Sequence, residues 1–547
     1  MVHPPDEVFN QPPDLGDLNL FTADPVVSNL AAPGSAELHR IGAVSGSRQF
    51  RDWGFLANRY PPELNTFDRF GRRIDQVEFH PAWHDLMATS VGMGITSLPH
   101  DQPAPDDAHQ DRAVRAYLVG QVEQGHMCPI SMTYAVVPAL RMQPEVAAAW
   151  EDALSSRVYD PTFRPLADKQ GALMGMGMTE RQGGSDVRSN TSQAVADGPG
   201  GPGGEYRITG HKWFCSAPMN DAFLVLAQAR GGLSCFLLPR WTPDGVQNNF
   251  RINRLKDKLG NRSNASAEVE FESSWAQMVG EEGRGVSTII EMVNATRLDC
   301  VIGAAAIMRQ AVTQAVWHVA HRSAFGADLI DQPLMQNVIA DLDLEAQAAT
   351  ALMIRLAASF DRADHDEHEA LVRRILTPIA KYWVTKRCSE VVREATECLG
   401  GGGYVEDSIM PRLYRESPLN AIWEGSGNVI ALDVLRVLNK EPRALDALLT
   451  EIETTAPSGL SGAVAKIRGE IQETENLESV ARRLVERLGI LAAASALGQH
   501  ATGDVTDAYI RSRVNGDHGS MYGTLPALID AARISERAYG LVEAART

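Results

Sequence analysis

One carboxylate in the sequence is placed to act as a general base. Glu424 follows the apolar residues 421–423 and precedes Gly425. Partial burial disfavours the charged form of a carboxylate and moves the pKa of such a group toward values that suit proton transfer. The same stretch also fits the start of a helix, with Ser426 or Asn428 as the N-cap after a glycine turn. The residues alone leave both interpretations open.

A glycine-rich segment over residues 175–186 could bind a phosphate group. Gly183 and Gly184 allow the backbone to approach a ligand closely, and Thr179 and Ser185 supply hydroxyl groups. Successive backbone N–H groups in such a turn can form an anion-binding nest. A plain glycine turn between two strands is the alternative. The pattern is neither a P-loop nor a GxGxxG, so the usual nucleotide-binding folds are not predicted.

Two further segments could contact a flat, phosphorylated ligand. Phe214 and Ser216 lie at the end of an expected strand, where a ring could stack on a heterocycle and a hydroxyl could bond a ring nitrogen. Adjacent aromatic residues in a sheet also pack together without any ligand. Arg322 is expected to end a helix, and its guanidinium could meet a phosphate.

The elements that must position these groups fall into four blocks. Residues 1–170 begin with an extended, proline-rich arm and continue with helical periodicity. Residues 171–280 contain short β-rich runs separated by turns, which predict an antiparallel sheet or barrel. Residues 281–440 form long, alanine-rich amphipathic helices, and residues 441–547 form a last helical block. We therefore expect an α+β multidomain protein with a β-barrel and a four-helix core.

Composition limits the classes of function. The chain of 547 residues exceeds what one core usually absorbs, and its net charge of −18 gives no general attraction to nucleic acid or to an anionic membrane. Its six cysteines show no CxxC or Cys/His ligand spacing, so neither a metal site nor a disulfide framework is predicted. There is no secretory signal and no apolar run of about 18 residues. We expect a soluble, cytoplasmic protein without a membrane segment.

In this order, these segments resemble the acyl-CoA dehydrogenase family, and within it the AidB branch, which is associated with the adaptive response to DNA alkylation. The stretches that carry the resemblance are FNQP at 9–12, FHPAWH at 79–84, MTERQGGSD at 178–186, RLKDKLGNRSNAS at 254–266, WEGSGN at 423–428 and DVLRVLNK at 433–440. The additional block after Lys440 also fits, because ordinary members of the family stop near that point. The resemblance covers nearly the whole chain.

The resemblance implies a helical domain, a β-barrel and a four-helix bundle in a homotetramer that holds FAD. It implies that Glu424 removes the α-proton of an acyl-CoA thioester while a hydride leaves the β-carbon for the flavin. Some members carry the base on an earlier helix, where this chain has Thr296, and this difference favours Glu424. The cofactor contacts that it implies are Met176, Met178, Thr179, Ser185, Phe214, Cys215, Ser216, Arg322, Phe325, Ile422, Trp423, Ser426 and Asn428.

Three positions depart from the family pattern. Phe214 stands where a tryptophan usually lies beside the flavin. Glu397 stands where a glutamine usually precedes a glycine turn, which in this sequence spans residues 400–403. A glutamine expected after the Arg-x-x-Phe-Gly segment is displaced by Pro333 to Gln332. The last two departures concern contacts to the ADP half of FAD.

The AidB branch implies binding of double-stranded DNA. Residues 441–547 hold 11 Lys+Arg against 15 Asp+Glu, which opposes a general attraction to phosphate. Binding therefore requires a local basic patch. Its candidates are Arg436, Lys440, Arg482, Arg483 and Arg487, or Arg511 and Arg513, although charges on a solvated helix face are the alternative.

The sequence thus predicts an FAD-dependent flavoprotein with residual acyl-CoA dehydrogenase chemistry that binds double-stranded DNA and protects it from alkylation damage. Two rival functions remain. In one, a DNA-binding protective protein keeps FAD as a structural group without turnover. In the other, the chain is an ordinary acyl-CoA dehydrogenase or oxidase.

Overall fold

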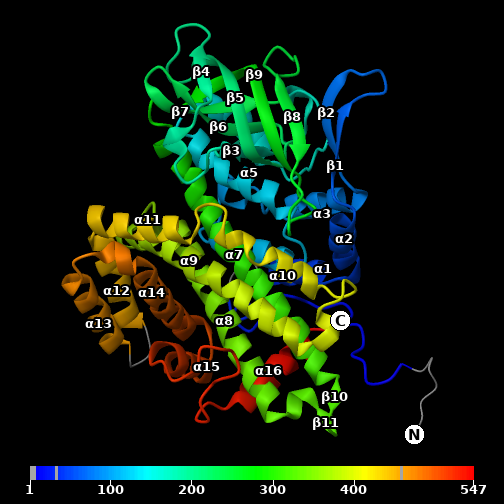
Figure 1. Cartoon of the computed structure of the whole chain (residues 1–547), viewed down its shortest axis with the longest axis vertical. Coiled ribbons are helices and arrows are strands. Elements are labelled where there is room, and N and C mark those ends of the chain that lie inside the picture. The colour runs from blue at the N-terminus through cyan, green and yellow to red at the C-terminus, as the bar shows by residue number, and fades with distance from the viewer. Residues whose placement is uncertain (1–7, 31–34, 456–459, 547) are drawn as a thin grey trace. The chain divides into compact units, whose positions relative to one another are not determined.

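The computed structural model describes residues 8–30, 35–455 and 460–546 (Figure 1). Their contacts divide the chain into two compact units. The barrel unit comprises residues 49–108 and 123–299, and the helical unit comprises residues 1–48, 109–122 and 300–547. The expected N-terminal block of residues 1–170 is therefore shared between the two units.

The barrel unit is built on a seven-stranded sheet (Figure 1). The strands follow the order β3-β6-β4-β5-β9-β7, β8 pairs with β9, and a β6–β7 pairing closes the ring. Apolar residues that point inward from alternate positions fill the barrel core, Ile208, Phe223 and Phe236 among them. The expected barrel is thus confirmed. Its strands are β3 (Met174–Gly177), β4 (Gln193–Ala196), β5 (Glu205–Ser216), β6 (Ala222–Ala229), β7 (Gly232–Pro239), β8 (Phe250–Leu255) and β9 (Ser266–Val279).

The rest of the barrel unit is mainly helical, with one departure from the sequence-based expectation. Its helices are α2 (Arg48–Arg59), α3 (Pro81–Gly92), α5 (Met127–Leu140) and α6 (Pro144–Leu154). A hairpin of β1 (Glu63–Phe67) and β2 (Arg73–Glu78) lies between α2 and α3 in the chain. Asp68 accepts hydrogen bonds from the backbone N–H groups of Phe70 and Arg72, which fixes the turn of the hairpin. The helical periodicity on both sides of this segment concealed it.

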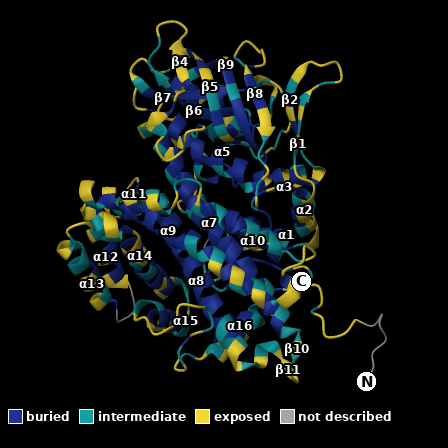
Figure 2. Ribbon diagram, in the orientation of Figure 1, coloured by how far each residue is buried: buried dark blue, intermediate teal, exposed yellow. Residues whose placement is uncertain are grey.

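The helical unit packs around α8. Helix α8 (Pro333–Arg362) is buried from Ile339 to Ser359 and contacts α9 (Glu367–Cys398), α14 (Leu477–His500) and α16 (Ala531–Ala544) (Figure 2). Residues 441–547 therefore share a core with the helices before them. The unit also holds α1 (Ser35–Ser45), α4 (Ala108–Gly120), α7 (Gly285–Ala320) from Cys300 onward, α10 (Met410–Glu416), α11 (Gly427–Lys440), α12 (Arg443–Thr455), α13 (Ser461–Glu473) and α15 (Gly503–Tyr509). Among the described helices, none is long and apolar enough to cross a membrane.

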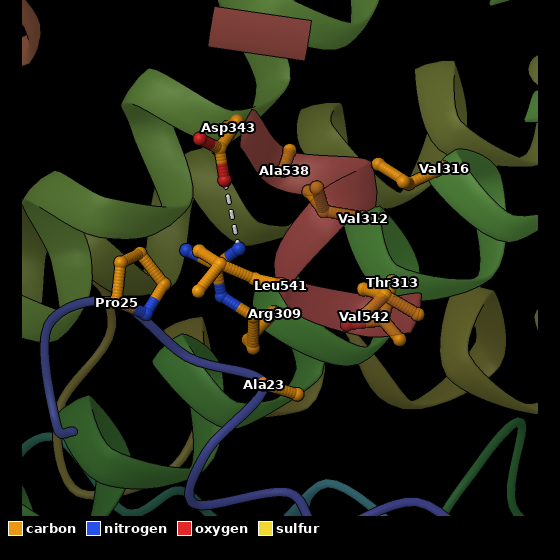
Figure 3. Close-up of a pocket in the computed structure, with 10 residues that line it drawn as sticks. All are labelled: Ala23, Pro25, Arg309, Val312, Thr313, Val316, Asp343, Ala538, Leu541 and Val542. Carbon is orange, nitrogen blue, oxygen red and sulfur yellow. Dashed lines mark hydrogen bonds and ion pairs between the residues drawn. The ribbon is translucent and has the colours of Figure 1, made fainter. Parts of the chain in front are cut away.

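The N-terminal arm is tied into the helical unit at several places. Leu18 forms a β-bridge with Arg546, whose guanidinium also donates to the carbonyl of Leu15 over 3.2 Å. Further along, Asp24 lies 2.9 Å from the guanidinium of Arg309, which also donates to Asp343 over 2.8 Å. A cavity of about 10 Å³, large enough for about one water molecule, adjoins this ion cluster (Figure 3). These contacts fix the arm against α7, α8 and α16.

Candidate functional site

The glycine-rich segment of the barrel unit lies beside the aromatic pair of β5. The backbone N–H of Trp213 donates to the carbonyl of Thr179 over 2.9 Å. The amide of Asn190 donates to the carbonyl of Met178 over 2.8 Å, and Met176 and Met178 are half-buried. The structure therefore brings together two segments that the sequence proposed separately.

The two glycines of this segment have different roles. Gly183 has a φ of +143°, and a Cβ built there would meet nothing within 4 Å, so its face is open. A Cβ at Gly184 would lie 2.5 Å from the hydroxyl oxygen of Thr179. Gly184 is thus required for packing, whereas Gly183 is required for the backbone conformation. Ser185 is exposed next to them.

A buried ion pair anchors the segment to the barrel. The ammonium of Lys212 lies 2.9 Å from a carboxylate oxygen of Glu180, and both side chains are at most 1% exposed. Lys212 also donates to the carbonyl of Leu226 over 2.7 Å, and Glu180 accepts from the backbone of Thr191 over 2.7 Å. Burial opposes the charge of Glu180, but the hydrogen bond from Thr191 and the charge of Lys212 lower its pKa to about 2. Sequence reasoning missed this pair, because no local pattern links residues 32 positions apart.

At a bulge in β5 two adjacent aromatic residues lie side by side, Phe214 exposed and Trp213 half-buried. The pairing of β5 with β9 shifts register between Lys212 and Cys215, so Trp213 and Phe214 do not alternate between inside and outside. Phe214 is 52% exposed. The ammonium of Lys256 lies 3.6 Å from the ring centre of Trp213 and 4.7 Å from that of Phe214. The result is a cation-flanked aromatic face.

The flanking residues of β5 differ in their access to a ligand. The hydroxyl of Ser216 is half-buried and lies 3.3 Å from that of Ser266. Cys215 is fully buried in the barrel core, and burial raises the pKa of its thiol to about 12. The predicted contact of Cys215 with a cofactor would therefore involve its backbone and not its thiol.

In the helical unit, Glu424 occupies a tight turn between the 3-10 turn Leu419–Ala421 and α11. Its φ is +56°, and that of Gly425 is +106°. A left-handed conformation disfavours a residue with a side chain by about 1–2 kcal/mol, so the surrounding contacts must hold it. Glu424 is half-buried, and Ile422 is 63% exposed. Trp423 donates its indole N–H to Asn420 over 2.8 Å.

Lys381 on α9 donates hydrogen bonds to the backbone of this turn. Its side chain is 1% exposed, and its ammonium donates to the carbonyl of Trp423 over 3.0 Å and to the carbonyl of Gly425. The two carbonyls flank Glu424 in the chain. Sequence reasoning missed Lys381, because a lysine within a long helix usually belongs to a solvated face. Pro378, inside the same helix three residues earlier, is a sequence signal that could have drawn attention to this part of α9.

A helix begins directly after this turn, as the alternative interpretation of Ser426 or Asn428 as an N-cap predicted. Ser426 occupies the N-cap position of α11, but its hydroxyl makes no capping hydrogen bond. Asn428 is exposed in the first turn of the helix. Neither observation assigns a ligand to these two polar side chains, and both are exposed.

Arg322 and Phe325 lie in a small hairpin held by the N-terminal arm. Strands β10 (Ser323–Ala324) and β11 (Ala327–Asp328) flank Phe325, which is 100% exposed with a φ of +54°. Asn10 donates to the carbonyl of Ser323 over 2.8 Å and accepts from its backbone N–H over 2.7 Å, and Arg322 donates to the carbonyl of Asn10. Gln332 donates to the carbonyl of Ala324 over 2.9 Å. The displaced glutamine thus braces the hairpin.

The basic residues proposed for DNA differ in accessibility. Arg436 is 56% exposed and lies 3.0 Å from Asp433, which Arg374 on α9 also approaches. Lys440, Arg482 and Arg483 are exposed on α11 and α14, which pack together, and Arg511 is 44% exposed. Arg513 is different.

The guanidinium of Arg513 is only 6% exposed and forms ion pairs with Asp341 and Glu345 of α8. It is committed to the core of the helical unit, which disfavours the predicted contact of this arginine with DNA. Lys386 on α9 is a basic neighbour that the sequence did not suggest. The charge of Arg482 adds to desolvation in lowering the pKa of Lys386.

Comparisons with known proteins agree with this architecture. Three family models match in succession: the AidB N-terminal domain over residues 10–161, and the middle and C-terminal domains of acyl-CoA dehydrogenase over residues 175–274 and 283–439. The Escherichia coli (strain K12) protein AidB is 44% identical over 92% of this chain and 93% of its own length.

Two solved structures extend the likeness to the fold. Caenorhabditis elegans ACDH-11 in complex with C11-CoA has a TM-score of 0.82 at 25% identity, with 93% of each chain covered. A Bacillus anthracis acyl-CoA dehydrogenase complexed with FAD has a TM-score of 0.65 at 16% identity, covering 96% of this chain and 91% of that one. With the matched domains and the identity to AidB, they show that this chain belongs to the acyl-CoA dehydrogenase family, in its AidB branch.

Proposed function

We propose that this protein is an FAD-dependent flavoprotein with residual acyl-CoA dehydrogenase chemistry that binds double-stranded DNA and protects it from alkylation damage. The observation that carries the enzymatic part is the conformation of Glu424. A half-buried carboxylate held in a left-handed turn fits a group selected for position, because this conformation has a cost that a plain helix start does not require. We also propose a homotetrameric, cytoplasmic protein.

The barrel residues fit the flavin that the family uses. Phe214 offers an exposed ring face, Ser216 offers a hydroxyl beside it, and the open backbone at Gly183 with exposed Ser185 suits an anionic group. Bound flavin would supply a hydride acceptor. In this proposal Phe214 packs on the ring, and Thr179, Ser185 and Ser216 donate hydrogen bonds.

Glu424 is the proposed base toward an acyl-CoA. Its carboxylate would accept the α-proton of the thioester, and the adjoining apolar residues Ile422 and Trp423 would exclude water from that proton. The complex of the related ACDH-11 with C11-CoA supports an acyl-CoA as the substrate class to try first.

The catalytic proposal is tested with purified protein under anaerobic conditions. Flavin released on denaturation would establish the cofactor, and bleaching of its absorbance by a panel of acyl-CoAs would establish dehydrogenase chemistry. Glu424→Gln should abolish the bleaching and leave the flavin content unchanged. Equal bleaching in this variant would remove Glu424 as the base. A flavin that no acyl-CoA bleaches would favour a structural cofactor.

The DNA proposal rests on two sites at each of which a pair of arginines shares one carboxylate. Arg374 and Arg436 share Asp433, while Arg483 and Arg487 share Glu470. Lys386 on α9 and Arg482 on α14 add two further cations, which lie close enough for their charges to interact. Phosphate contacts release counterions, so duplex affinity should fall linearly with salt on logarithmic axes. Absence of duplex binding at low salt would contradict this part.

A further inference from the structure

We infer that Lys381 is the positioning residue of the candidate base, acting on Glu424 through the backbone on either side of it. The inference rests on the proposed role of Glu424 and adds the group that fixes its direction. Lys381 reaches the turn from α9 and lies 43 positions before Glu424 in the chain. In the proposed role, Lys381 contacts the backbone of the turn and not a reacting atom of the substrate.

The geometry gives one ammonium control over two peptide groups. The carbonyl of Trp423 belongs to the peptide group that enters Glu424, and the carbonyl of Gly425 belongs to the one that leaves the turn. With both ends held, the φ and ψ angles of Glu424 and Gly425 can change only together. The Cα–Cβ bond of Glu424, and therefore the direction of its carboxylate, is defined by these angles.

The left-handed φ of Glu424 makes such a hold necessary. Without it, the residue would gain about 1–2 kcal/mol by relaxing to an ordinary conformation. A hydrogen bond from a charged donor contributes roughly 1.5–3 kcal/mol, so two of them outweigh this tendency. A lysine suits the task, because its compact ammonium has three N–H donors that can serve both carbonyls at once.

Burial of the lysine is a second indication of a positional role. Lys381 is 1% exposed in α9, and burying an ammonium is unfavourable unless its hydrogen bonds are satisfied. An apolar side chain would fill the same space without that cost. The turn would then need another donor for its two carbonyls.

Hydrogen exchange of the turn tests the hold directly, without need of any substrate. In Lys381→Met, the amides of residues 422–426 should exchange at least about tenfold faster than in the wild type, as expected for the loss of two hydrogen bonds. Lys381→Gln, whose amide can donate to one of the two carbonyls, should give an exchange rate between those of the wild type and Lys381→Met. If the Met variant does not fold, the exchange rate of Lys381→Gln tests the inference. Thr377→Val, a buried change one turn earlier on α9 at a hydroxyl that bonds the carbonyl of Arg373, should leave the exchange unchanged. Equal exchange in all four proteins would overturn the inference.

Flavin bleaching then tests the consequence for chemistry. In Lys381→Met the rate constant of bleaching by a saturating acyl-CoA should fall by about 10- to 100-fold, because a misplaced base loses effective concentration, while the acyl-CoA concentration for half-saturation stays the same. A fall in affinity alone would contradict positioning. If wild-type flavin is not bleached by any acyl-CoA, the proposed function of Glu424 fails, and the exchange experiment still decides whether Lys381 holds the turn. If the wild type is bleached and Lys381→Met matches it, the positioning role fails alone.

Discussion

The ammonium of Lys212 and the carboxylate of Glu180 lie 2.9 Å apart inside the barrel unit, with side chains 1% and 0% exposed. The pair joins the middle of β5 to the segment that carries Thr179 and Ser185. Its partners are fixed too, since Lys212 donates to Leu226 and Glu180 accepts from Thr191. The segment with the open glycine is therefore anchored at its first turn.

Removing one charge of this pair should destabilise the protein strongly. Glu180→Gln leaves Lys212 buried without its counter-ion, and we expect a loss of about 3 kcal/mol in the free energy of unfolding, measured by urea denaturation. Glu270→Gln is the matched control, because Glu270 pairs with Arg181 at the surface, where both side chains are about half exposed. The control should change stability by less than about 1 kcal/mol. Equal effects of the two changes would refute the anchoring role.

The same pair predicts a dependence of stability on acid. The pKa of Glu180 is about 2 in the folded protein against an ordinary value of 4.5. A lowered folded pKa means that the contribution is present above about pH 4.5 and is lost as the pH falls toward 2. The difference in melting temperature between the wild type and Glu180→Gln should therefore shrink over that interval. A difference that stays constant down to pH 2 would show that the carboxylate is not stabilised as described.

Replacement of Phe214 should affect flavin binding more than folding. Phe214→Ala removes an exposed ring, so the melting temperature should hardly change, whereas the dissociation constant for FAD should rise about fivefold with the loss of about 1 kcal/mol of aromatic stacking. Phe214→Trp supplies the residue usual in the family and should retain the flavin. Fluorescence titration of the apoprotein with FAD measures the dissociation constant of each variant. Unaltered affinity in the Ala variant would place the flavin elsewhere.

Arg436 and Arg513 should behave in opposite ways when each is replaced by alanine. Arg436→Ala should keep the melting temperature and reduce the slope of log duplex affinity against log salt by about 1, as for one lost phosphate contact. Arg513→Ala should lower the free energy of unfolding by about 3–5 kcal/mol, because Asp341 and Glu345 lose a buried partner. At a temperature where it is folded, its salt slope should match the wild type. A reduced slope in Arg513→Ala would mean that this arginine reaches DNA after all.

Asn10 should govern the order of the β10–β11 hairpin. Asn10→Gly removes both hydrogen bonds to Ser323 but retains a residue suited to the φ of +51° at this position. We expect a loss of about 1 kcal/mol in stability and faster hydrogen exchange in residues 323–328. Asn10→Ala adds the cost of the left-handed backbone and should be worse. Protection of the hairpin in both variants would show that the arm does not hold it.

The sequence predicts the parts of this fold that local patterns determine. Turn-separated β-rich runs identified the barrel, long amphipathic helices identified the helical unit, and the stretch around Glu424 was singled out by its glycines and its isolated acid. The hairpin β1–β2 was missed because it is short and lies between strongly helical segments. Local evidence of this kind identifies elements better than it identifies their partners.

The missed site residues all depend on contacts between distant parts of the chain. Lys381 and Lys212 look like surface lysines until the fold buries them beside Trp423 and Glu180. Arg513 looked available for DNA because its acidic partners lie 168 or more positions away, in α8. The family resemblance placed Cys215 at the cofactor, and only the bulge in β5 shows that its thiol turns into the barrel core.

The β-bridge between Leu18 and Arg546 has a consequence for biosynthesis. Arg546 also donates to Leu15, 531 residues before it, so the arm has no complete docking partner until Arg546 has been synthesised. At about 5–20 residues per second, the arm must wait for roughly half a minute to two minutes after it leaves the ribosome. Residues 123–299, by contrast, form one continuous stretch of the barrel unit and can begin to fold within that time. The barrel unit can therefore begin to fold before the contact between Leu18 and Arg546 forms.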